Sequence, residues 1–349
     1  MHGSSDVGHL VDRHPSVTPE RLIEQLVPPP TFADVGFDTY QPDPAEPSQA
    51  EAVSACRRFC EQAIERRAGK KKLFGKREVL PGVGVYLDGG FGVGKTHLLA
   101  SSYYEVARAS DYRQAFATFG ELTQLAGVFG FVECIDLLSD YALVCIDEFE
   151  LDDPGNTTLI SRLLSALVER GVSVAATSNT LPEQLGEGRF AAQDFLREIH
   201  TLAAMFTTVR IEGPDYRHRD LPPAPEPPGD AEVAERAAQV PGATLDDFDA
   251  LCAHLATMHP SRYLTLIEGV AEVYITGVHP IDDQNVALRL VSLTDRLYDA
   301  GIPVVASGAK LDTIFSDDML AGGFRKKYLR ATSRLLALTA AGQSGRTIT

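Results

Sequence analysis

The residues best suited to chemistry in this chain lie together between positions 89 and 96. They fit the pattern G-x-x-x-x-G-K-[ST] and are Gly89, Gly90, Phe91, Gly92, Val93, Gly94, Lys95 and Thr96. Glycines allow backbone N–H groups to wrap closely around phosphate oxygens, because side chains would obstruct the turns required. Lys95 supplies a point charge for the β- and γ-phosphates, and the Thr96 hydroxyl is suited to ligate Mg²⁺. The segment therefore predicts a site for a nucleoside triphosphate.

The elements on either side of the segment are those that position such a loop. The apolar run from Val83 to Leu87 predicts a strand that leads into it. A helix is expected to begin at Thr96 and to continue through His97 and Ala100, so that its N-terminus faces the phosphates. His97 is accordingly included among the expected nucleotide-binding residues.

A second motif is an apolar strand, Leu143 to Ile146, that ends in two carboxylates. Successive side chains on a strand alternate between its faces, so Asp147 and Glu148 share one role only if the strand ends there and the backbone turns. Asp147 is expected to hold Mg²⁺ through water, since Mg²⁺ keeps much of its hydration shell beside phosphates. Glu148 is expected to orient and deprotonate the attacking water. The chain contains no N-K-x-D guanine signature, which favours ATP.

The strand "VSVAATSN" ends in Ser178 and Asn179, at the sheet edge where open α/β folds bind ligands. Asn179 is positioned to hold the attacking water near the γ-phosphate. The same dipeptide is also an ordinary helix cap before Thr180. The two roles are compatible.

Composition limits the class of protein. At 349 residues the chain exceeds the usual size of a single core, so two domains are expected. A net charge of −16 opposes delocalised binding to nucleic acid or anionic membrane, and the basic run Lys70 to Arg77 is interpreted as a solvated loop. The five cysteines lack metal-pair spacing, no apolar run approaches about 18 residues, and the N-terminus resembles no signal peptide. We expect a cytoplasmic protein without an integral membrane segment.

Apolar runs alternate with amphipathic helices, which predicts an α/β fold with a parallel five-stranded sheet and helices on both faces. Its strands are expected at 83–88, 115–119, 141–147, 172–178 and 207–212. The expected organisation is an extended lead-in segment over residues 1–48, a P-loop domain over 49–219, a proline-rich acidic linker or insertion over 220–242, and a smaller C-terminal α/β domain over 243–349.

The order of these motifs resembles AAA+ ATPases. The segments "GGFGVGKTHLL", "IDEFELDD", "TSNTLPEQL", "FLREI", "GPDYRHR", "LTDRLYD" and "ATSRLLAL" together resemble the ZapE family of cell-division ATPases, whose eukaryotic relatives are mitochondrial. The likeness covers roughly residues 45 to 340. It implies hydrolysis of ATP with Mg²⁺, a homo-oligomeric ring, an arginine finger supplied by the neighbouring subunit, and a role at the division septum through the tubulin-like ring protein.

The chain departs from the family pattern between the Ser-Asn strand and "FLRE". Arg189 is the first candidate for the finger and Arg197, where the family has proline, is the second; each is also suited to a surface salt bridge. Gln49 precedes the nucleotide domain and is interpreted as an exposed helical residue, with a place near the adenine as the alternative. Arg289 is a weaker candidate for a second-domain contact to the γ-phosphate.

Two other functions fit the same motifs. A replication initiator or helicase loader uses similar "GKTHL" and "IDE" segments, but the acidic balance and the absence of a clear DNA-reading motif oppose nucleic-acid binding. A nucleotide-gated adaptor with little turnover is opposed by Glu148 and favoured by the altered finger region.

Overall fold

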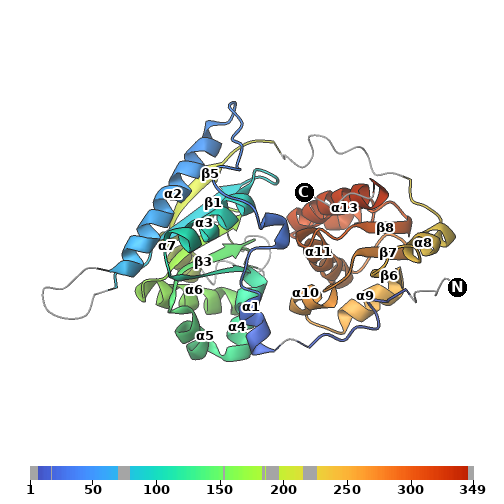
Figure 1. Ribbon diagram of the computed structural model, residues 1–349, viewed down its shortest axis with the longest axis horizontal. Helices are drawn as coiled ribbons and strands as arrows, with labels where there is room; N and C mark the ends of the chain where they lie inside the picture. Colours follow the sequence, from blue (N-terminus) through green and yellow to red (C-terminus); the bar gives the residue numbers. More distant parts are fainter. Residues whose placement is uncertain are drawn as a thin grey trace, which may run out of the picture. The chain divides into compact units, whose positions relative to one another are not determined.

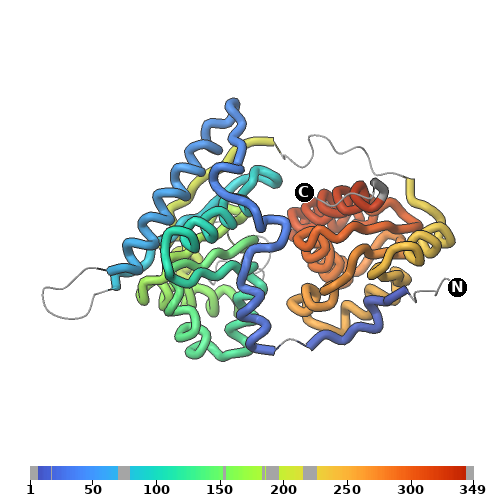
Figure 2. Tube along the Cα trace, viewed as in Figure 1, coloured from blue at the N-terminus to red at the C-terminus, as the bar shows by residue number. Residues whose placement is uncertain are grey.

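The computed structural model describes residues 7–16, 18–69, 79–151, 154–182, 185, 196–214 and 226–344. The chain divides into two compact units, drawn in Figure 1 and traced in Figure 2. The P-loop unit comprises Thr18–Pro28 and Phe32–Tyr216. The C-terminal unit comprises Met1–Val17, Pro29–Thr31 and Arg217–Thr349.

The P-loop unit is built on a five-stranded parallel sheet with the strand order β2-β3-β4-β1-β5. The strands are β1 Gly84–Gly89, β2 Arg113–Thr118, β3 Tyr141–Asp147, β4 Ser173–Ser178 and β5 Phe206–Ile211. Every residue of β1, β3 and β4 is buried, as expected for central strands that are covered on both faces. The five strands expected from the sequence are present, with small differences at their ends.

Helices cover both faces of this sheet. They are α1 Pro19–Glu24, α2 Pro47–Ala68, α3 Lys95–Ala109, α4 Phe119–Phe129, α5 Phe131–Leu138, α6 Pro154–Glu169 and α7 Leu196–Met205. On the face of α2 and α3, Val85 and Leu87 of β1 are buried in one apolar cluster. The alternate residue Tyr86 points to the other face, where its ring meets Phe149 and Phe206 edge-on. The fold class expected from the sequence is confirmed.

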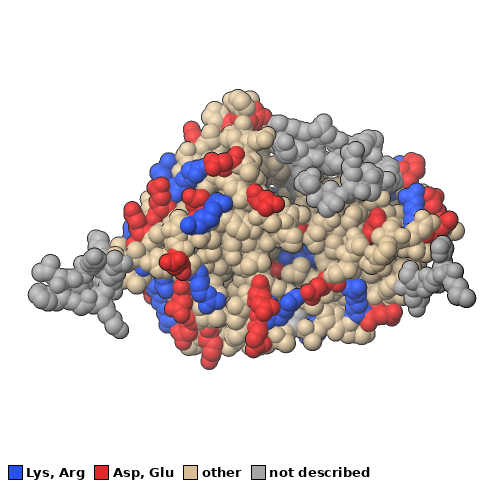
Figure 3. Space-filling view, in the orientation of Figure 1, with Lys and Arg blue, Asp and Glu red and all other residues tan. Residues whose placement is uncertain are grey.

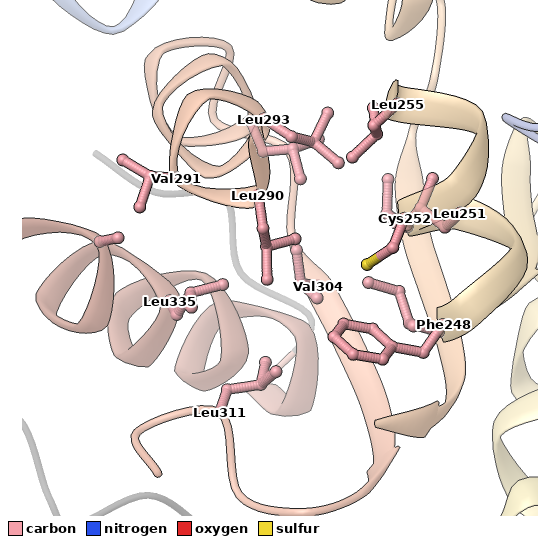
Figure 4. Packing of buried hydrophobic residues seen from close by; sticks show 14 of the residues in the cluster. Phe248, Leu251, Cys252, Leu255, Leu290, Val291, Leu293, Val304, Leu311 and Leu335 are labelled. Atoms are coloured by element: carbon pink, nitrogen blue, oxygen red, sulfur yellow. The ribbon is translucent and has the colours of Figure 1, made fainter. Parts of the chain in front are cut away.

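The C-terminal unit is a smaller α/β unit with a parallel sheet in the order β6-β7-β8. Its elements are η5 Pro260–Arg262, α8 Asp230–Ala237, α9 Phe248–Ala256, α10 Tyr263–Leu266, α11 Gln284–Asp299, α12 Asp317–Ala321, α13 Arg325–Ser344, β6 Ala243–Asp247, β7 Glu272–Val278 and β8 Val304–Gly308. The core lies where α9, α11 and α13 meet the sheet. Phe248, Leu290, Val304 and Leu335 all point into it (Figure 4). This unit has its own apolar core.

The expectation of one extended lead-in over residues 1–48 is wrong. Residues 7–16 belong to the C-terminal unit, where Gly8 pairs with Thr244 beside β6 and the Leu10 side chain is fully buried. The Leu10 backbone N–H also donates to the Asp246 carboxylate (3.0 Å). Residues 18–28 and 32–48 belong to the P-loop unit and include α1, while η1 covers Pro30–Phe32. A few apolar side chains fix a segment whose composition resembles a linker.

The expectation of a proline-rich linker or insertion over residues 220–242 is wrong for its second half. Residues 230–237 form α8, which packs against β7 and β8, and Val233 and Ala237 are buried there. All but one of the prolines in this range lie before Gly229, the exception being Pro241, whereas the stretch "DAEVAERA" contains none and presents one apolar face. Strand β6, which follows, was not expected from the sequence.

Candidate functional site

The predicted phosphate loop connects β1 to α3. Gly92 has φ 64° and Gly94, which caps α3, has φ 84°, a region that side chains disfavour. Within the described chain no side chain caps the N-terminus of α3, and its first turn contains no acidic residue. The first N–H groups of α3 and its dipole therefore favour an anion at this end.

Lys95 lies at the centre of the predicted site. Its Nζ donates to the carbonyl oxygens of Gly89 (2.9 Å) and Gly90 (2.5 Å) and to Oδ1 of Asn179 (2.7 Å). The amide of Asn179 thus reaches the loop from the end of β4. Oxygen acceptors surround the ammonium, and phosphate oxygens are acceptors of the same kind.

Thr96 and Asp147 form the second pair of the site. The Thr96 hydroxyl donates to the Asp147 carboxylate, at 3.2 Å from Oδ1 and 3.1 Å from Oδ2, and only 6% of Asp147 is exposed. Hard oxygen donors on one side of a phosphate-binding loop suit Mg²⁺, which binds through one or two protein oxygens beside phosphates. The two residues expected to hold Mg²⁺ therefore fit that ion.

Glu148 follows the last residue of β3. Its φ of 55° makes it the one non-glycine residue with positive φ in the described part of the chain. The strand ends at Asp147 and the backbone turns, which is the condition under which the two neighbouring carboxylates serve one site. The Glu148 backbone N–H donates to the hydroxyl of Thr177 on β4 (3.1 Å). Thr177 did not stand out in the sequence, because a threonine inside a strand carries no local signal.

The segment Gly36 to Tyr40, here called the strap, packs against the phosphate loop. The Tyr40 hydroxyl donates to the Val93 carbonyl (2.8 Å), and its ring meets the His97 ring edge-on with centroids 5.5 Å apart. His97 Nε2 lies 3.1 Å from the Gly36 carbonyl oxygen. Burial raises the pKa of Tyr40 to about 12 and lowers that of His97. The His97 side chain is thus directed to the strap, a contact that sequence spacing does not reveal.

A buried carboxylate precedes the loop. Asp88 on β1 is 1% exposed and accepts a hydrogen bond from the guanidinium of Arg210, its partner in register on β5. Arg210 itself is 57% exposed. This ion pair neutralises a negative charge next to Gly89, where an anion is expected to bind.

The remaining predicted residues differ in outcome. Arg189 lies outside the described residues, and Arg197 is exposed in the first turn of α7. Gln49 is buried, not exposed as expected. Its amide donates to the Glu212 carbonyl (2.9 Å) and accepts from the Asp43 backbone N–H (2.8 Å), so its polar atoms are satisfied inside the unit. Arg289 donates to carbonyl oxygens inside the C-terminal unit, at 2.8 and 2.7 Å. It fastens α9 and the residues after it to α11.

Two sequence segments that carried the family resemblance meet in the C-terminal unit. Asp295 of "LTDRLYD" binds Arg330 (2.7 Å) and Arg334 of "ATSRLLAL". The three side chains are at most 13% exposed. Burial raises the pKa of Asp295, but the two arginines outweigh it and hold that pKa below its ordinary value. The cluster joins α11 to α13.

The described part of the chain contains no group of three or more His, Cys, Asp and Glu side chains that could hold a metal ion. No helix in this part of the chain is both long and apolar enough to cross a bilayer. On the face drawn in Figure 3, acidic and basic side chains are interspersed.

A phosphate loop that joins β1 to α3 in a parallel sheet of order β2-β3-β4-β1-β5, with the neighbouring strand β3 leading into Asp147 and Glu148, defines a P-loop fold of the AAA+ type. The chain belongs to the AFG1-like ATPase family, whose model matches residues 16–228 and 223–347. The resemblance seen in the sequence is thereby confirmed.

Among curated proteins, the Escherichia coli K12 cell division protein ZapE is 33% identical over 161 residues, which are 43% of this chain and 43% of that protein. The zebrafish (Danio rerio) lactation elevated protein 1 homolog B is 27% identical over 165 residues, 41% of this chain and 32% of the relative. The matched part of the chain thus spans less than half the length of these relatives.

Solved structures give weaker likenesses. The DnaI structure is 20% identical with a TM-score of 0.42 and covers 55% of this chain and 97% of its own. AMPPCP-bound DnaA from Aquifex aeolicus is 13% identical with a TM-score of 0.38, over 60% of this chain and 56% of its own.

Proposed function

We propose that the protein is a Mg²⁺-dependent ATPase that converts ATP and water to ADP and phosphate. The observation that carries the proposal is the arrangement at the carboxyl ends of β1, β3 and β4. There Lys95 and Asn179 are hydrogen-bonded to each other, and Thr96 and Asp147 form a second bonded pair. Family membership supports the same activity.

Each residue has a role that follows from its chemistry. The N–H groups from Gly89 to Thr96 and the Lys95 ammonium bind phosphate oxygens and orient the γ-phosphate. Asn179 holds the attacking water, and Glu148 accepts the proton that this water loses. Thr96 and Asp147 are the residues that would hold Mg²⁺. When bound, that ion neutralises charge on the phosphate oxygens.

We further propose that the active form is a homo-oligomeric ring in which a neighbouring subunit completes the site. Among the described residues of one subunit, Lys95 is the cation that the phosphate loop itself supplies. The resemblance of the sequence to AAA+ ATPases implies that a neighbouring subunit supplies an arginine. Such an arginine contributes about 10³- to 10⁵-fold to the rate of nucleotide hydrolysis. Arg189 remains the first candidate and the exposed Arg197 the second.

The partner proposed for this ATPase is a protein of the division septum, the tubulin-like ring protein, with the reaction taking place in the cytoplasm. This proposal is supported by the name of the Escherichia coli relative and by the resemblance of the sequence to its family. It is tested by sedimenting filaments of the ring protein with the chain, with and without ATP. Equal amounts of bound chain and unchanged filament mass under both conditions would contradict it.

The test of the trans arrangement mixes two inactive variants. Glu148→Gln keeps Arg189 but lacks the base, whereas Arg189→Ala keeps the base but lacks the finger. For the wild type, the rate of phosphate release should rise with protein concentration. Each variant alone should release phosphate more slowly than the wild type. A mixture should regain part of the activity, because one kind of interface then contains both groups. A mixture no more active than its components would show that Arg189 is not the trans finger, and the same mixture with Arg197→Ala tests the second candidate.

A further inference from the structure

We infer that Thr177 is a positioning residue that holds the Asp147–Glu148 turn in its reactive conformation. This inference rests on the proposed function, because it assigns Thr177 a part in presenting the general base of that reaction. Thr177 belongs to β4, while both carboxylates follow from β3 beside it. The two strands are hydrogen-bonded neighbours whose register ends at the pair Ile146 and Ala176. Thr177 lies one residue beyond that ladder.

Thr177 binds three consecutive residues of the turn. Its hydroxyl donates to Oδ1 of Asp147 (2.5 Å) and accepts from the Glu148 backbone N–H (3.1 Å). Its carbonyl accepts from the Phe149 backbone N–H (2.7 Å). A threonine hydroxyl has one hydrogen to donate and two lone pairs to accept with, so both of its contacts are made in compatible directions. Thr177 is 2% exposed, which strengthens these bonds and makes their loss costly.

The conformation held by Thr177 is one that the chain disfavours. Glu148 adopts φ 55°, and a non-glycine residue keeps such a conformation only where its surroundings fix it. On one side, Asp147 is held by the two hydroxyls of Thr96 and Thr177. On the other side, the Phe149 ring is fully buried against Phe119, with centroids 5.4 Å apart. Between these anchors, the Thr177 hydroxyl accepts a hydrogen bond from the Glu148 backbone N–H.

The Thr177 hydroxyl has two effects on the proposed reaction. It orients the Asp147 carboxylate toward Thr96, and it fixes the backbone of Glu148, so that the Glu148 side chain starts from a defined position. Without the hydroxyl the backbone of residue 148 can relax toward negative φ, and its carboxylate then moves away from the water that it must deprotonate. Binding of ATP depends mainly on the loop and Lys95, so the loss should fall on turnover.

The experiment compares Thr177→Val, which keeps the shape of the side chain, with Thr177→Ser, which keeps the hydroxyl. We expect kcat of Thr177→Val to fall by about 10- to 100-fold, the usual penalty for a misplaced catalytic group. We expect Thr177→Ser to stay within about threefold of the wild type, and the Kd for MgATP to stay within about threefold in both variants. In the double variant Thr177→Val/Glu148→Gln, the fold-loss of kcat should be smaller than the product of the two single fold-losses, because both substitutions act on the same carboxylate.

A second measurement needs no turnover. Hydrogen exchange of the peptide that contains Glu148 and Phe149 should become about tenfold faster in Thr177→Val and stay unchanged in Thr177→Ser. Faster exchange in Thr177→Val than in the wild type, together with a wild type that does not hydrolyse ATP, would sustain the inference and overturn the proposed function. An unchanged kcat, unchanged exchange, or an equal loss of kcat and ATP affinity in Thr177→Val would overturn the inference while leaving the ATPase intact.

Discussion

The phosphate loop offers a matched pair of substitutions that tests the described geometry. Gly94 has φ 84°, and a Cβ atom placed there would lie 2.4 Å from Cε2 of Tyr40. Gly90 belongs to the same loop, yet a Cβ there would meet no described atom within 4 Å. Gly94→Ala should therefore destabilise the P-loop unit, and Gly90→Ala should not.

The cost of Gly94→Ala follows from two effects. A left-handed conformation costs an alanine roughly 1 to 2 kcal/mol. Displacing the Tyr40 ring breaks its hydrogen bond to the Val93 carbonyl, worth about 0.5 to 1.5 kcal/mol. Its edge contact with the His97 ring contributes about 0.5 to 1.5 kcal/mol more. Because these terms overlap, we expect a loss of about 2 to 4 kcal/mol for Gly94→Ala, against about 0.5 kcal/mol or less for Gly90→Ala.

The assay is urea denaturation. The unfolding transition of the P-loop unit is identified as the one that MgATP shifts to higher urea concentration, because a ligand stabilises the unit that binds it. The double variant Tyr40→Ala/Gly94→Ala should lose less stability than the sum of its single variants, since removing the ring removes the clash. Equal stability of Gly94→Ala and Gly90→Ala, or strict additivity in the double variant, would refute the described contact between the strap and the loop.

Three further changes test other contacts. Tyr40→Phe removes the hydrogen bond to Val93 and should cost about 0.5 to 1.5 kcal/mol in the same denaturation assay, whereas an unchanged stability would show that this bond contributes nothing. Arg210→Met leaves the buried Asp88 carboxylate without its cation and should raise the Kd for ATP about 3- to 10-fold by calorimetry, because an unneutralised carboxylate beside the phosphates costs about 0.7 to 1.4 kcal/mol of binding. The added change Asp88→Asn should restore the affinity, and a failure to do so would exclude charge as the cause. Asp295→Asn should lower stability at pH 7 by about 3 kcal/mol, because two buried arginines then lose their carboxylate. The pKa of Asp295 is lower in the folded than in the unfolded protein, so the ionised carboxylate stabilises the fold above the unfolded pKa of about 4. This stabilisation is lost as the pH falls below that value. A difference in unfolding free energy between variant and wild type that stays constant down to pH 3 would contradict this.

Sequence patterns predicted the elements whose signals are local. The phosphate loop, the strand that ends in Asp147 and Glu148, and the strand that ends in Asn179 each combine an apolar run with polar residues at one end. Parallel strands bring such ends to one sheet edge, so Lys95 and Asn179 could be expected to meet.

Contacts between distant segments could not be predicted in this way. The role of Thr177 depends on which strand lies beside β3 and on its register. Tyr40 reaches the loop from a proline-rich stretch whose composition suggests no fixed structure. Leu10, which is buried beside β6, lies in a segment of the same kind. These positions are fixed by tertiary packing, which local propensity does not encode.

The role of Glu148 as the general base is tested by measuring the hydrolysis of saturating MgATP by Glu148→Gln, with the Kd for ATP determined on the same protein. Removing the group that accepts the proton of the attacking water should lower kcat by about 10²- to 10⁴-fold. The Kd should stay within about threefold of the wild type, because Glu148 is not among the phosphate-binding groups. Hydrolysis by Glu148→Gln at the wild-type rate would show that Glu148 is not the general base.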